Sequence, residues 1–375
     1  MKKSYLPAII LAMATSCIYP YDPDLDGTND DIVVLEGSIV IGGNATARLS
    51  KMHPLKDNVS TTYAIGTVTV EDDGGIVYAS SSGPGEIVTI PMKDASPDRQ
   101  YRMRAVVGGK EYVSDWMTAL SPPEIKSVSF TADDDLVYVS ASIDGGKDPT
   151  GYLALSFEET WEFHSDYAGW YQLDTMKWKI SKRNDIYPNY WCWKTESSTL
   201  TSLVDYSEME GNRVESFPVR QFSRSDSRNH RKYSINIKAF TLPKETYRYL
   251  KNMNDLSSGG GSLFTPNPGE MVSNIQCESD PGQVVFGYVT AALVSTYREF
   301  MGNDYFKYRT PQVSSLVIPN EPEYMYYYYR GFYPIDEMVF SDDDGKEQSG
   351  IAWGPLRCID CVAAGGTREK PDFWK

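Results

Sequence analysis

The chain has 375 residues and a formal net charge of −15, with 51 acidic against 36 basic side chains. Proteins that bind nucleic acids need a basic footprint, and proteins held on anionic lipid by charge need basic clusters. The composition therefore argues against both kinds of partner. A chain of this length is expected to fold into two or three domains with full-sized cores.

The first seventeen residues have the pattern of an export signal. Lys2 and Lys3 precede a short apolar run, Tyr5–Ala14, and small residues then lead up to Cys17. An apolar run of about ten residues covers roughly 15 Å as a helix, half the hydrocarbon core of a bilayer. It is therefore typical of a secretory signal and not of a membrane span. We interpret residues 1–16 as a lipoprotein signal peptide and Cys17 as the residue that carries the lipid. An ordinary secretory signal with a chance cysteine is the alternative.

The segment that follows is acidic, with two prolines and five aspartates before the next apolar run. It has too few apolar side chains to form a core. Residues 17–31 are therefore predicted to be an acidic tether.

Residues 32–121 contain short alternating apolar segments separated by glycine-rich turns. The clearest pair is Tyr101–Val107 and Glu111–Ser114, on either side of Gly108-Gly109. A glycine pair between two strands predicts a tight hairpin, because type I′ turns need positive φ at both central residues. Strands at this spacing predict an immunoglobulin-like β-sandwich. Pro122-Pro123 marks its end, because proline interrupts both helices and strand ladders. Further strands are expected at 32–40, 45–49, 67–70, 76–79 and 86–90.

Residues 122–375 are predicted to form a larger β-rich domain with one short helix, so that the whole chain is mainly β. The helix is expected from Pro243 to about Leu256, because proline is tolerated in a first turn and Gly259-Gly260-Gly261 follows as a stop signal. The apolar run Val284–Val294 predicts a buried central strand. Other strands are expected at 125–130, 136–142, 152–164 and 232–240.

Four cysteines follow the predicted lipidation site, namely Cys192, Cys277, Cys358 and Cys361. An even number in an oxidising compartment predicts disulfides, with three possible pairings. The spacing of Cys358 and Cys361 also raises a redox site and a metal site as alternatives. A thioredoxin-like pair should open a helix, yet Pro355 lies just before this one. The histidines are scattered singly, unlike zinc ligands. We therefore favour structural disulfides, and we predict no metal and no cofactor.

The sequence carries none of the usual catalytic motifs. It has no Gly-x-Ser-x-Gly elbow, no His-Glu-x-x-His and no phosphate-binding glycine loop before a helix. A glycosidase needs only two carboxylates, but 51 acidic residues make any chosen pair uninformative. We interpret Asp133–Asp135 and Asp342–Asp344 as solvated turns, because calcium loops space their ligands differently. The sequence therefore predicts that the protein is not an enzyme, and a surface hydrolase ranks last among the possible functions.

Aromatic residues are concentrated around Trp191 and in the run Tyr324–Tyr333. As a strand, the run would place alternate tyrosines on opposite faces, with Tyr326 and Tyr328 on the same one. One face could pack on a core while the other offers flat amphipathic rings to a sugar, a peptide or a partner protein. Packing of a large β domain is the alternative explanation. The candidate binding residues are Trp191, Trp193, Tyr326, Tyr328 and Tyr329.

The closing segment Cys358–Trp374 combines a spaced cysteine pair, a glycine pair and a Lys-Pro-Asp-Phe-Trp end. It resembles the closing signature of a Bacteroidetes family, DUF4249. The resemblance spans nearly the whole chain after the signal, and it is also carried by Tyr19-Pro20, Val33–Gly37, Tyr247–Leu250, Phe264–Ile275 and Val285–Tyr288.

The resemblance implies a location and a partner. Members of the family look like outer-membrane lipoproteins encoded beside TonB-dependent transporters, and no catalytic residues are established for them. Asp22 and Asp24 resemble the acidic surface-export signals of Bacteroidetes lipoproteins, which favours the outer face of the membrane. We therefore expect an outer-membrane lipoprotein at the cell surface, held in the membrane by the lipid on Cys17. It would serve as a non-catalytic accessory or ligand-capture subunit of a TonB-dependent transporter. A stand-alone glycan- or peptide-binding surface lipoprotein is the alternative.

Overall fold

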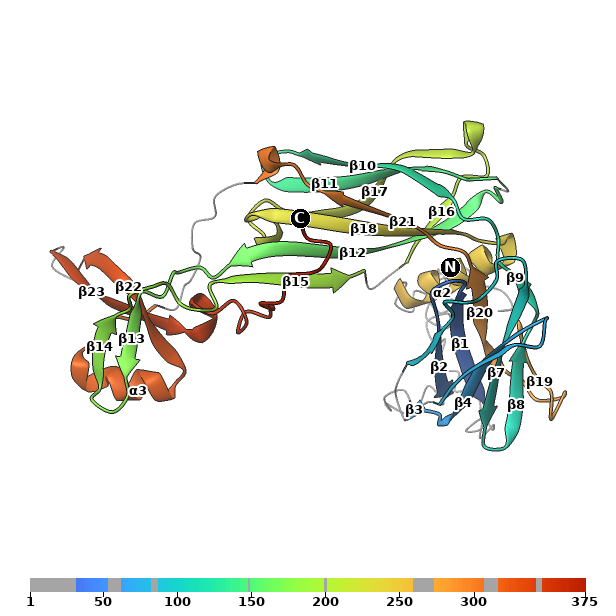
Figure 1. The fold of residues 1–375 in the computed structure, drawn as a ribbon, viewed down its shortest axis with the longest axis horizontal. Coiled ribbons are helices and arrows are strands. Elements are labelled where there is room, and N and C mark those ends of the chain that lie inside the picture. The colour runs from blue at the N-terminus through green and yellow to red at the C-terminus, as the bar shows by residue number, and fades with distance from the viewer. Residues whose placement is uncertain are drawn as a thin grey trace, which may run out of the picture.

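The computed structural model describes residues 32–52, 62–81, 87–147, 149–198, 201–258, 273–306, 316–341 and 346–375. The predicted signal peptide, the acidic tether with Cys17, the acidic run Asp342–Asp344 and most of Phe264–Ile275 lie outside these residues. The described chain forms two β-sandwiches and a smaller lobe. In Figure 1 the first sandwich lies below the right-hand end of the second, and the lobe lies at the left-hand end of the molecule. The predicted mainly β fold is confirmed. Among the described residues, no helix is both long enough and apolar enough to cross a membrane.

The first sandwich consists of two facing sheets around one apolar core. One sheet contains β1 (Val33–Val40), β2 (Asn44–Lys51), β3 (Thr62–Tyr63), β6 (Val88–Pro91) and β20 (Phe286–Ala292). The other contains β4 (Gly66–Asp72), β5 (Val77–Ser81), β7 (Gln100–Val107), β8 (Lys110–Ser114), β9 (Met117–Thr118) and β19 (Ile275–Cys277). The strand orders are β20-β1-β2-β3, with β6 also on β2, and β19-β8-β7-β4-β5, with β9 also on β7.

The alternating pattern of the sequence places one side of each strand in this core. Along β1, Leu35 and Ile39 are fully buried, whereas Glu36 between them lies on the outer face and is only partly covered. The predicted hairpin is confirmed as β7 and β8. Gly108 and Gly109 have φ angles of 59° and 82°, as its tight turn requires.

Strand β20 returns to the first sandwich from far along the chain and pairs in parallel with β1. A Cβ atom on Gly287, whose φ is 109°, would lie 2.0 Å from the carbonyl oxygen of Leu35. Only glycine therefore allows this pairing. The other edge of β20 is covered by the side chain of Asn274. Its carbonyl accepts from the Val289 amide (2.9 Å), and its NH₂ group donates to the Val289 carbonyl (2.8 Å).

The prediction of a central strand at Val284–Val294 is therefore wrong, since β20 lies at the edge of its strand order. The run is apolar because one face of β20 packs into the core of the sandwich, where Val289 is fully buried. Its opposite face is partly covered by the helix α2 (Lys244–Ser258), through a stacked contact between Tyr249 and Tyr288. Covering on both faces produces a continuous apolar run even at an edge.

The same return changes the division into domains. The predicted domain boundary after residue 121 assigns most strands to the correct sandwich. Residues 275–277 and 286–292, however, pair with the first sandwich although they lie after this boundary. After β20 the chain leaves again as β21 (Ser295–Phe300), which pairs with β18 (Lys232–Thr241) of the second sandwich. The two sandwiches are therefore connected by three chain crossings.

The second sandwich packs a three-stranded sheet on a five-stranded one. The smaller sheet has the order β10-β11-β17, from β10 (Glu124–Ala132), β11 (Leu136–Asp144) and β17 (Arg213–Ser223). The larger sheet combines β18 and β21 with β12 (Tyr152–His164), β15 (Trp191–Ser197) and β16 (Ser202–Asp205), in the order β15-β12-β18-β21 with β16 on β12. The long strand predicted at 152–164 is confirmed as β12. Short 3₁₀ turns lie at Glu210–Asn212, Ser227–Asn229 and Asn303–Tyr305.

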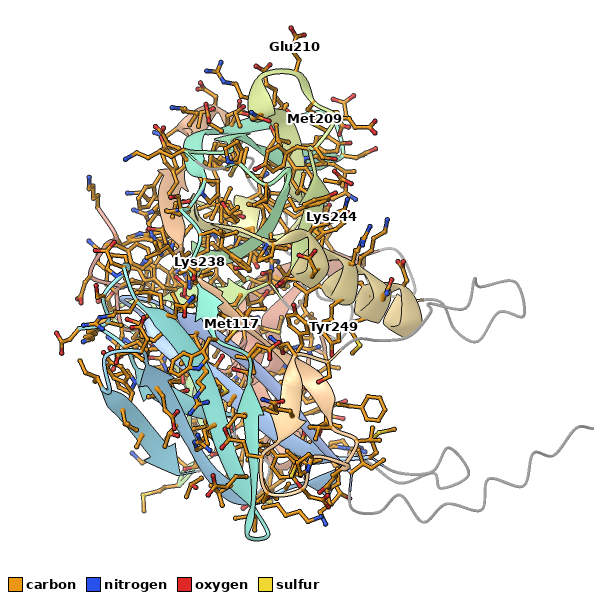
Figure 2. The ribbon with its side chains drawn as sticks, turned by 90° about the vertical axis from the view of Figure 1, so that its right-hand side faces the viewer. Met117, Met209, Glu210, Lys238, Lys244 and Tyr249 are labelled. Carbon is orange, nitrogen blue, oxygen red and sulfur yellow. A yellow bond between two sulfur atoms is a disulfide. The ribbon has the colours of Figure 1, made fainter. Side chains whose placement is uncertain are left out.

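The predicted helix is confirmed as α2, which begins directly after Pro243 and carries Glu245 in its first turn. Tyr247 is buried against Tyr152 of the second sandwich, with ring centroids 4.6 Å apart. Tyr249 faces the first sandwich. Figure 2 shows α2 between the two sandwiches, with Tyr249 on its lower side. The helix therefore bridges the two sandwiches.

The third part, which we call the tip lobe, lies at the end of the molecule opposite the first sandwich (Figure 1). It contains two hairpins, one from β13 (Tyr171–Asp174) and β14 (Lys179–Lys182) and one from β22 (Phe332–Ser341) and β23 (Glu347–Pro355). A 3₁₀ turn, Glu321–Glu323, leads into the short helix α3 (Tyr324–Tyr329), and another, Leu356–Cys358, follows β23. Ile335, Cys358 and Ile359 form a small core of their own.

The C-terminal tail runs back from the tip lobe along the second sandwich. Trp193 and Thr367 exchange two backbone hydrogen bonds of 2.8 Å. Trp374 is buried near the end of the chain and donates its indole N–H to Glu162 of β12 (3.3 Å). The tail therefore ties the tip lobe to the sandwich beside it.

Candidate functional site

The structure separates the predicted aromatic binding residues into two places. Tyr326, Tyr328 and Tyr329 lie on α3 in the tip lobe, whereas Trp191 and Trp193 lie on β15 of the second sandwich. No ring contact among the described residues joins the two sets. They are therefore two surfaces and not one platform.

The prediction of a strand over Tyr324–Tyr333 is wrong for its first part, which is helical. Asn320 and Glu323 form a capping box, in which the Glu323 carboxylate accepts from the Asn320 amide (2.8 Å). Pro322 suits the first turn because its missing N–H has no partner there. Gly331, with a φ of 80°, ends the helix, and the strand β22 begins at the next residue.

One side of α3 holds the helix on the tip lobe. Tyr324 stacks on the fully buried ring of Trp353, with centroids 5.1 Å apart. Tyr328 packs edge-on against Tyr333 at 5.6 Å. Burial and the nearby carboxylate of Glu321 raise the pKa of Tyr324, so its hydroxyl stays protonated. These contacts fix the orientation of the helix.

The other side of α3 is open to solvent. Tyr329 is 76% exposed, Tyr326 is 56% exposed and Met325 is 48% exposed. The Arg330 guanidinium lies over the ring of Tyr326 at 4.8 Å. A rigid helix therefore presents two tyrosines, a methionine and an arginine, which are residue types enriched at protein interfaces.

The turn between β13 and β14 adds to this surface. Trp178 lies in it with a φ of 52°, a left-handed conformation that is costly for a bulky side chain. In this conformation its ring meets Tyr328 and Tyr329 at 5.9 and 6.1 Å. Met176 of the same turn is 92% exposed. Trp178 and Met176 are not among the candidate binding residues predicted from the sequence. The sequence feature that could have indicated them is a pair of apolar side chains within a short polar turn.

A half-buried carboxylate joins the two hairpins of the tip lobe. Asp336 of β22 accepts a hydrogen bond from the backbone amide of Trp170, just before β13 (3.3 Å). Burial raises the pKa of Asp336, although hydrogen bonds from the Trp170 and Ala168 amides offset part of the effect. The contact fixes the position of the β13–β14 turn, and therefore of Trp178, relative to α3.

Trp191 and Trp193 are half-buried and belong to a different environment. Trp191 lies edge-on to His164 and Tyr190, with the Arg231 guanidinium 4.4 Å from its ring. The backbone of Trp193 pairs with the tail. These contacts agree with the packing alternative for this pair of tryptophans.

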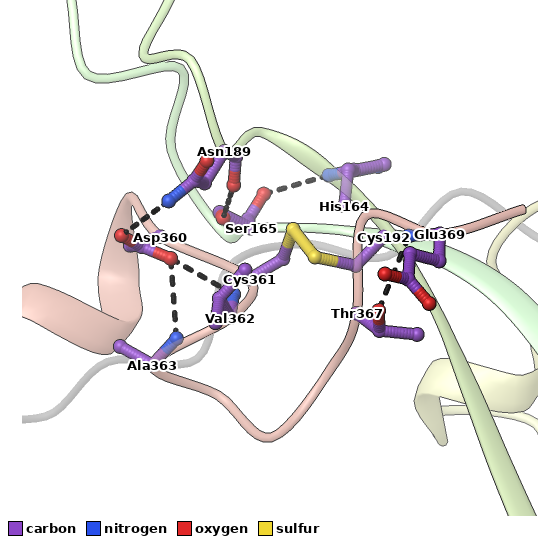
Figure 3. The surroundings of a disulfide bond; sticks show 10 residues. All are labelled: His164, Ser165, Asn189, Cys192, Asp360, Cys361, Val362, Ala363, Thr367 and Glu369. Carbon is purple, nitrogen blue, oxygen red and sulfur yellow. Dashed lines mark hydrogen bonds between the residues drawn. A yellow bond between two sulfur atoms is a disulfide. The ribbon is translucent and has the colours of Figure 1, made fainter.

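Only two of the four candidate cysteines form a disulfide. Cys192 on β15 is bonded to Cys361 in the tail (Figure 3). Cys277 and Cys358 are buried free thiols, so their assignment to disulfides is wrong. Cys358 faces the core of the tip lobe while Cys361 faces that of the second sandwich, and the two therefore cannot meet. Burial raises the pKa of Cys358 to about 11, which keeps its thiol unreactive.

The disulfide lies in a hydrogen-bonded loop. The Asp360 carboxylate accepts from the amides of Val362 (2.8 Å) and Ala363 (3.1 Å) and from the Asn189 side chain (2.9 Å), as Figure 3 shows. This loop holds Cys361 against β15. Within the described part of the chain, no group of three or more potential metal-ligating side chains comes together.

Comparison with known proteins gives a family but no activity. A model of a domain of unknown function, DUF4249, matches residues 18–298. No curated protein matches the chain. A two-domain fibronectin type III segment of chicken tenascin aligns with 12% identity over 56% of this chain and 90% of its own, at a TM-score of 0.17. A proposed carbohydrate-binding protein from Bacteroides uniformis ATCC 8492 aligns with 8% identity over 57% and 91%, at a TM-score of 0.15. The chain belongs to the DUF4249 family.

Proposed function

We propose that this chain is a lipid-anchored, non-catalytic accessory subunit that docks on a TonB-dependent transporter at the outer face of the outer membrane and helps it to capture its ligand. The observation that carries the proposal is the exposed aromatic surface of the tip lobe, formed by α3 and the β13–β14 turn. An exposed patch of this kind, rimmed by charged residues, marks an interaction site more often than an idle surface.

The shape of the surface supports a protein partner. Tyr326 and Tyr329 are presented by a helix whose other side is fixed on Trp353, so little ordering is required on binding. The strained backbone of Trp178 holds an aromatic ring beneath them, and strain of this kind collects at functional sites. Both features favour a preformed docking surface.

The position of the surface supports a second attachment point far from the lipid anchor. The predicted tether precedes β1 of the first sandwich, and the tip lobe lies at the opposite end of the molecule (Figure 1). A lipid on Cys17 and a contact at the tip would attach the protein at two distant points. Two linked attachments raise the effective concentration of the second and strengthen the whole.

Purification from native outer membrane tests the proposal. The wild-type chain should retain a transporter, whereas Tyr326→Ser combined with Tyr329→Ser should reduce its recovery at least tenfold, because interface aromatics commonly dominate binding energy. The matched control is Tyr63→Ser, an exposed tyrosine of the first sandwich, which should leave recovery unchanged. Failure of the wild-type chain to retain any transporter would overturn the proposal.

The same rings could serve a stand-alone glycan- or peptide-binding protein, because exposed tyrosines also stack on sugars. Calorimetry separates the two functions. An accessory subunit that acts through the tip should bind no free ligand there, so heat of binding that Tyr329→Ser abolishes would favour the stand-alone function.

A further inference from the structure

A groove between the first sandwich and α2 belongs to neither of the surfaces described above. Its volume is about 410 Å³, within the range of small-ligand sites. One wall is the outer face of the β20-β1-β2 sheet, and the other is the side of α2 that carries Tyr249. Leu203 of β16 and Phe240 of β18 supply apolar surface from the second sandwich. Figure 2 labels Tyr249 on the side of α2 that faces this wall.

The sheet wall presents polar side chains in two rows. The pairing of β1 with β20 and β2 aligns Tyr288, Glu36 and Arg48 in one row. The next row on the same face consists of Thr290, Ser38 and Thr46. All six line the groove, because the alternate residues of these strands face the core of the sandwich.

A pair of aromatic rings, one from each wall, lies in the groove. The rings of Tyr249 and Tyr288 stack at 4.5 Å, and the hydroxyls of Tyr288 and Thr246 are 3.1 Å apart. Burial, together with the Glu36 carboxylate and Tyr288, raises the pKa of Tyr249 to about 12. The Tyr249 hydroxyl therefore remains a protonated donor at any physiological pH.

Among the described lining residues, the groove has one acidic side chain, Glu36, and one basic side chain, Arg48. Glu36 and Arg48 face each other across β1 and β2, yet no ion pair joins them in the described structure. An anionic ligand would meet the Glu36 carboxylate beside Arg48, the one cation among the described lining residues. A peptide strand could not add to this wall, since β1 is paired on both sides and the Asn274 side chain covers the outer edge of β20 at Val289. A purely apolar ligand would bury both charges without partners.

A neutral, hydroxyl-rich ligand satisfies all of these groups. Hydroxyls both donate and accept, so they can match the serine, threonine and tyrosine hydroxyls as well as the carboxylate and the guanidinium. The apolar faces of a sugar ring pack on aromatic and aliphatic side chains, which Tyr249, Leu203 and Phe240 provide. We propose that the groove between α2 and the β20-β1-β2 sheet binds a short neutral saccharide. The inference goes beyond docking at the tip lobe and does not depend on it.

A glycan array tests the inference with the full chain purified in detergent. The array carries neutral and acidic mono- to tetrasaccharides beside a set of short peptides, and calorimetry follows with the glycan retained most strongly. We expect neutral glycans to be retained. Glu36→Gln should weaken binding and raise the dissociation constant roughly tenfold, because a hydrogen bond to a charged group is replaced by a neutral one. Thr46→Val, which removes one hydroxyl and keeps the shape, should also weaken binding.

The matched control is Tyr138→Ser on β11, an exposed tyrosine outside both the groove and the tip lobe, which should bind the glycan as the wild type does. Melting temperatures of all variants show whether the fold is retained. Retention of no glycan, of acidic glycans alone or of peptides alone overturns the inference. Binding that survives both groove variants, or that Tyr138→Ser abolishes, also overturns it. Because transporter recovery depends on the tip variants and glycan binding on the groove variants, each proposal can fail without the other.

Discussion

Glu159 is the central acceptor of a buried ionic network in the second sandwich. Its carboxylate accepts from Arg228 (2.9 Å) and from the Tyr233 hydroxyl (2.9 Å), and Arg220 lies 3.3 Å away. The Arg228 guanidinium lies 4.1 Å from the ring centre of Trp161, which is also buried. Burial and the charge of Glu159 raise the pKa of Tyr233 well above its usual value. The network holds β12, β17 and β18 in register by charge-assisted hydrogen bonds.

Neutralising Glu159 should therefore destabilise the sandwich strongly. Glu159→Gln keeps the shape of the side chain but leaves part of the buried positive charge without its partner. We expect a loss of about 2–4 kcal/mol in the free energy of unfolding, measured by urea denaturation.

The neighbouring residue on the opposite face of β12 provides a matched control. Glu158 pairs with Arg298 at 2.9 Å, and both side chains are partly exposed. Glu158→Gln should cost less than about 1 kcal/mol, because solvent screens such a pair. Equal losses from the two variants would contradict a buried role for Glu159.

The bond between Cys192 and Cys361 spans 169 residues of sequence. Closing so long a loop restricts the unfolded chain and contributes roughly 3–5 kcal/mol. Reductant should therefore lower the melting temperature by about 10 °C. Cys277→Ala should keep this response, since Cys277 is a free thiol. The same melting temperature with and without reductant would show that the bond does not stabilise the fold.

At the scale of elements, α3 shows why a run of one residue type predicts poorly. Four consecutive tyrosines contain no period, so the run itself cannot distinguish a helix from a strand. The information lies beside it, in the Asn320 and Glu323 capping box and in the stop at Gly331. The exposure of Tyr326 and Tyr329 cannot be predicted from the run itself, because it depends on how α3 packs on Trp353.

Strand β20 shows how a side chain can complete the edge of a sheet. Asn274 pairs with both backbone groups of Val289 as a neighbouring strand would. Asn274→Ala should leave a buried amide and carbonyl unpaired and destabilise the protein by about 1–3 kcal/mol. Hydrogen exchange should report faster exchange of the Val289 amide.

Gln276 of β19 provides the control, because its side chain is exposed. Gln276→Ala should change neither stability nor the exchange of Val289. Unchanged protection of Val289 in Asn274→Ala would show that the edge is held by other contacts.

At the scale of the whole molecule, the first sandwich depends on strands that lie far along the chain. Residues 32–121 alone lack β19 and β20, so β1 would become an edge and the core would lose the fully buried Val289. We expect this fragment to unfold without cooperativity. Joining residues 273–293 to it through a flexible linker should restore a cooperative transition, followed by circular dichroism on heating. An equally sharp transition at the same temperature for both fragments would contradict this dependence.

The sequence by itself determined the local features of this protein. The mainly β fold, the Gly108-Gly109 hairpin, the strand at 152–164 and the helix after Pro243 all follow from side-chain periodicity and from the backbone limits of glycine and proline. These features depend only on residues that are close together in the sequence.

Only the tertiary structure decided which distant residues meet. The return of β20 to β1, the choice of Cys361 over Cys358 as the partner of Cys192, and the groove between Glu36 and Tyr249 each join segments more than a hundred residues apart. A charged Glu36 within an apolar strand was the one local sign of the groove. Such contacts are selected by the packing of whole sheets, because a residue's burial and partners depend on surfaces that exist only after folding.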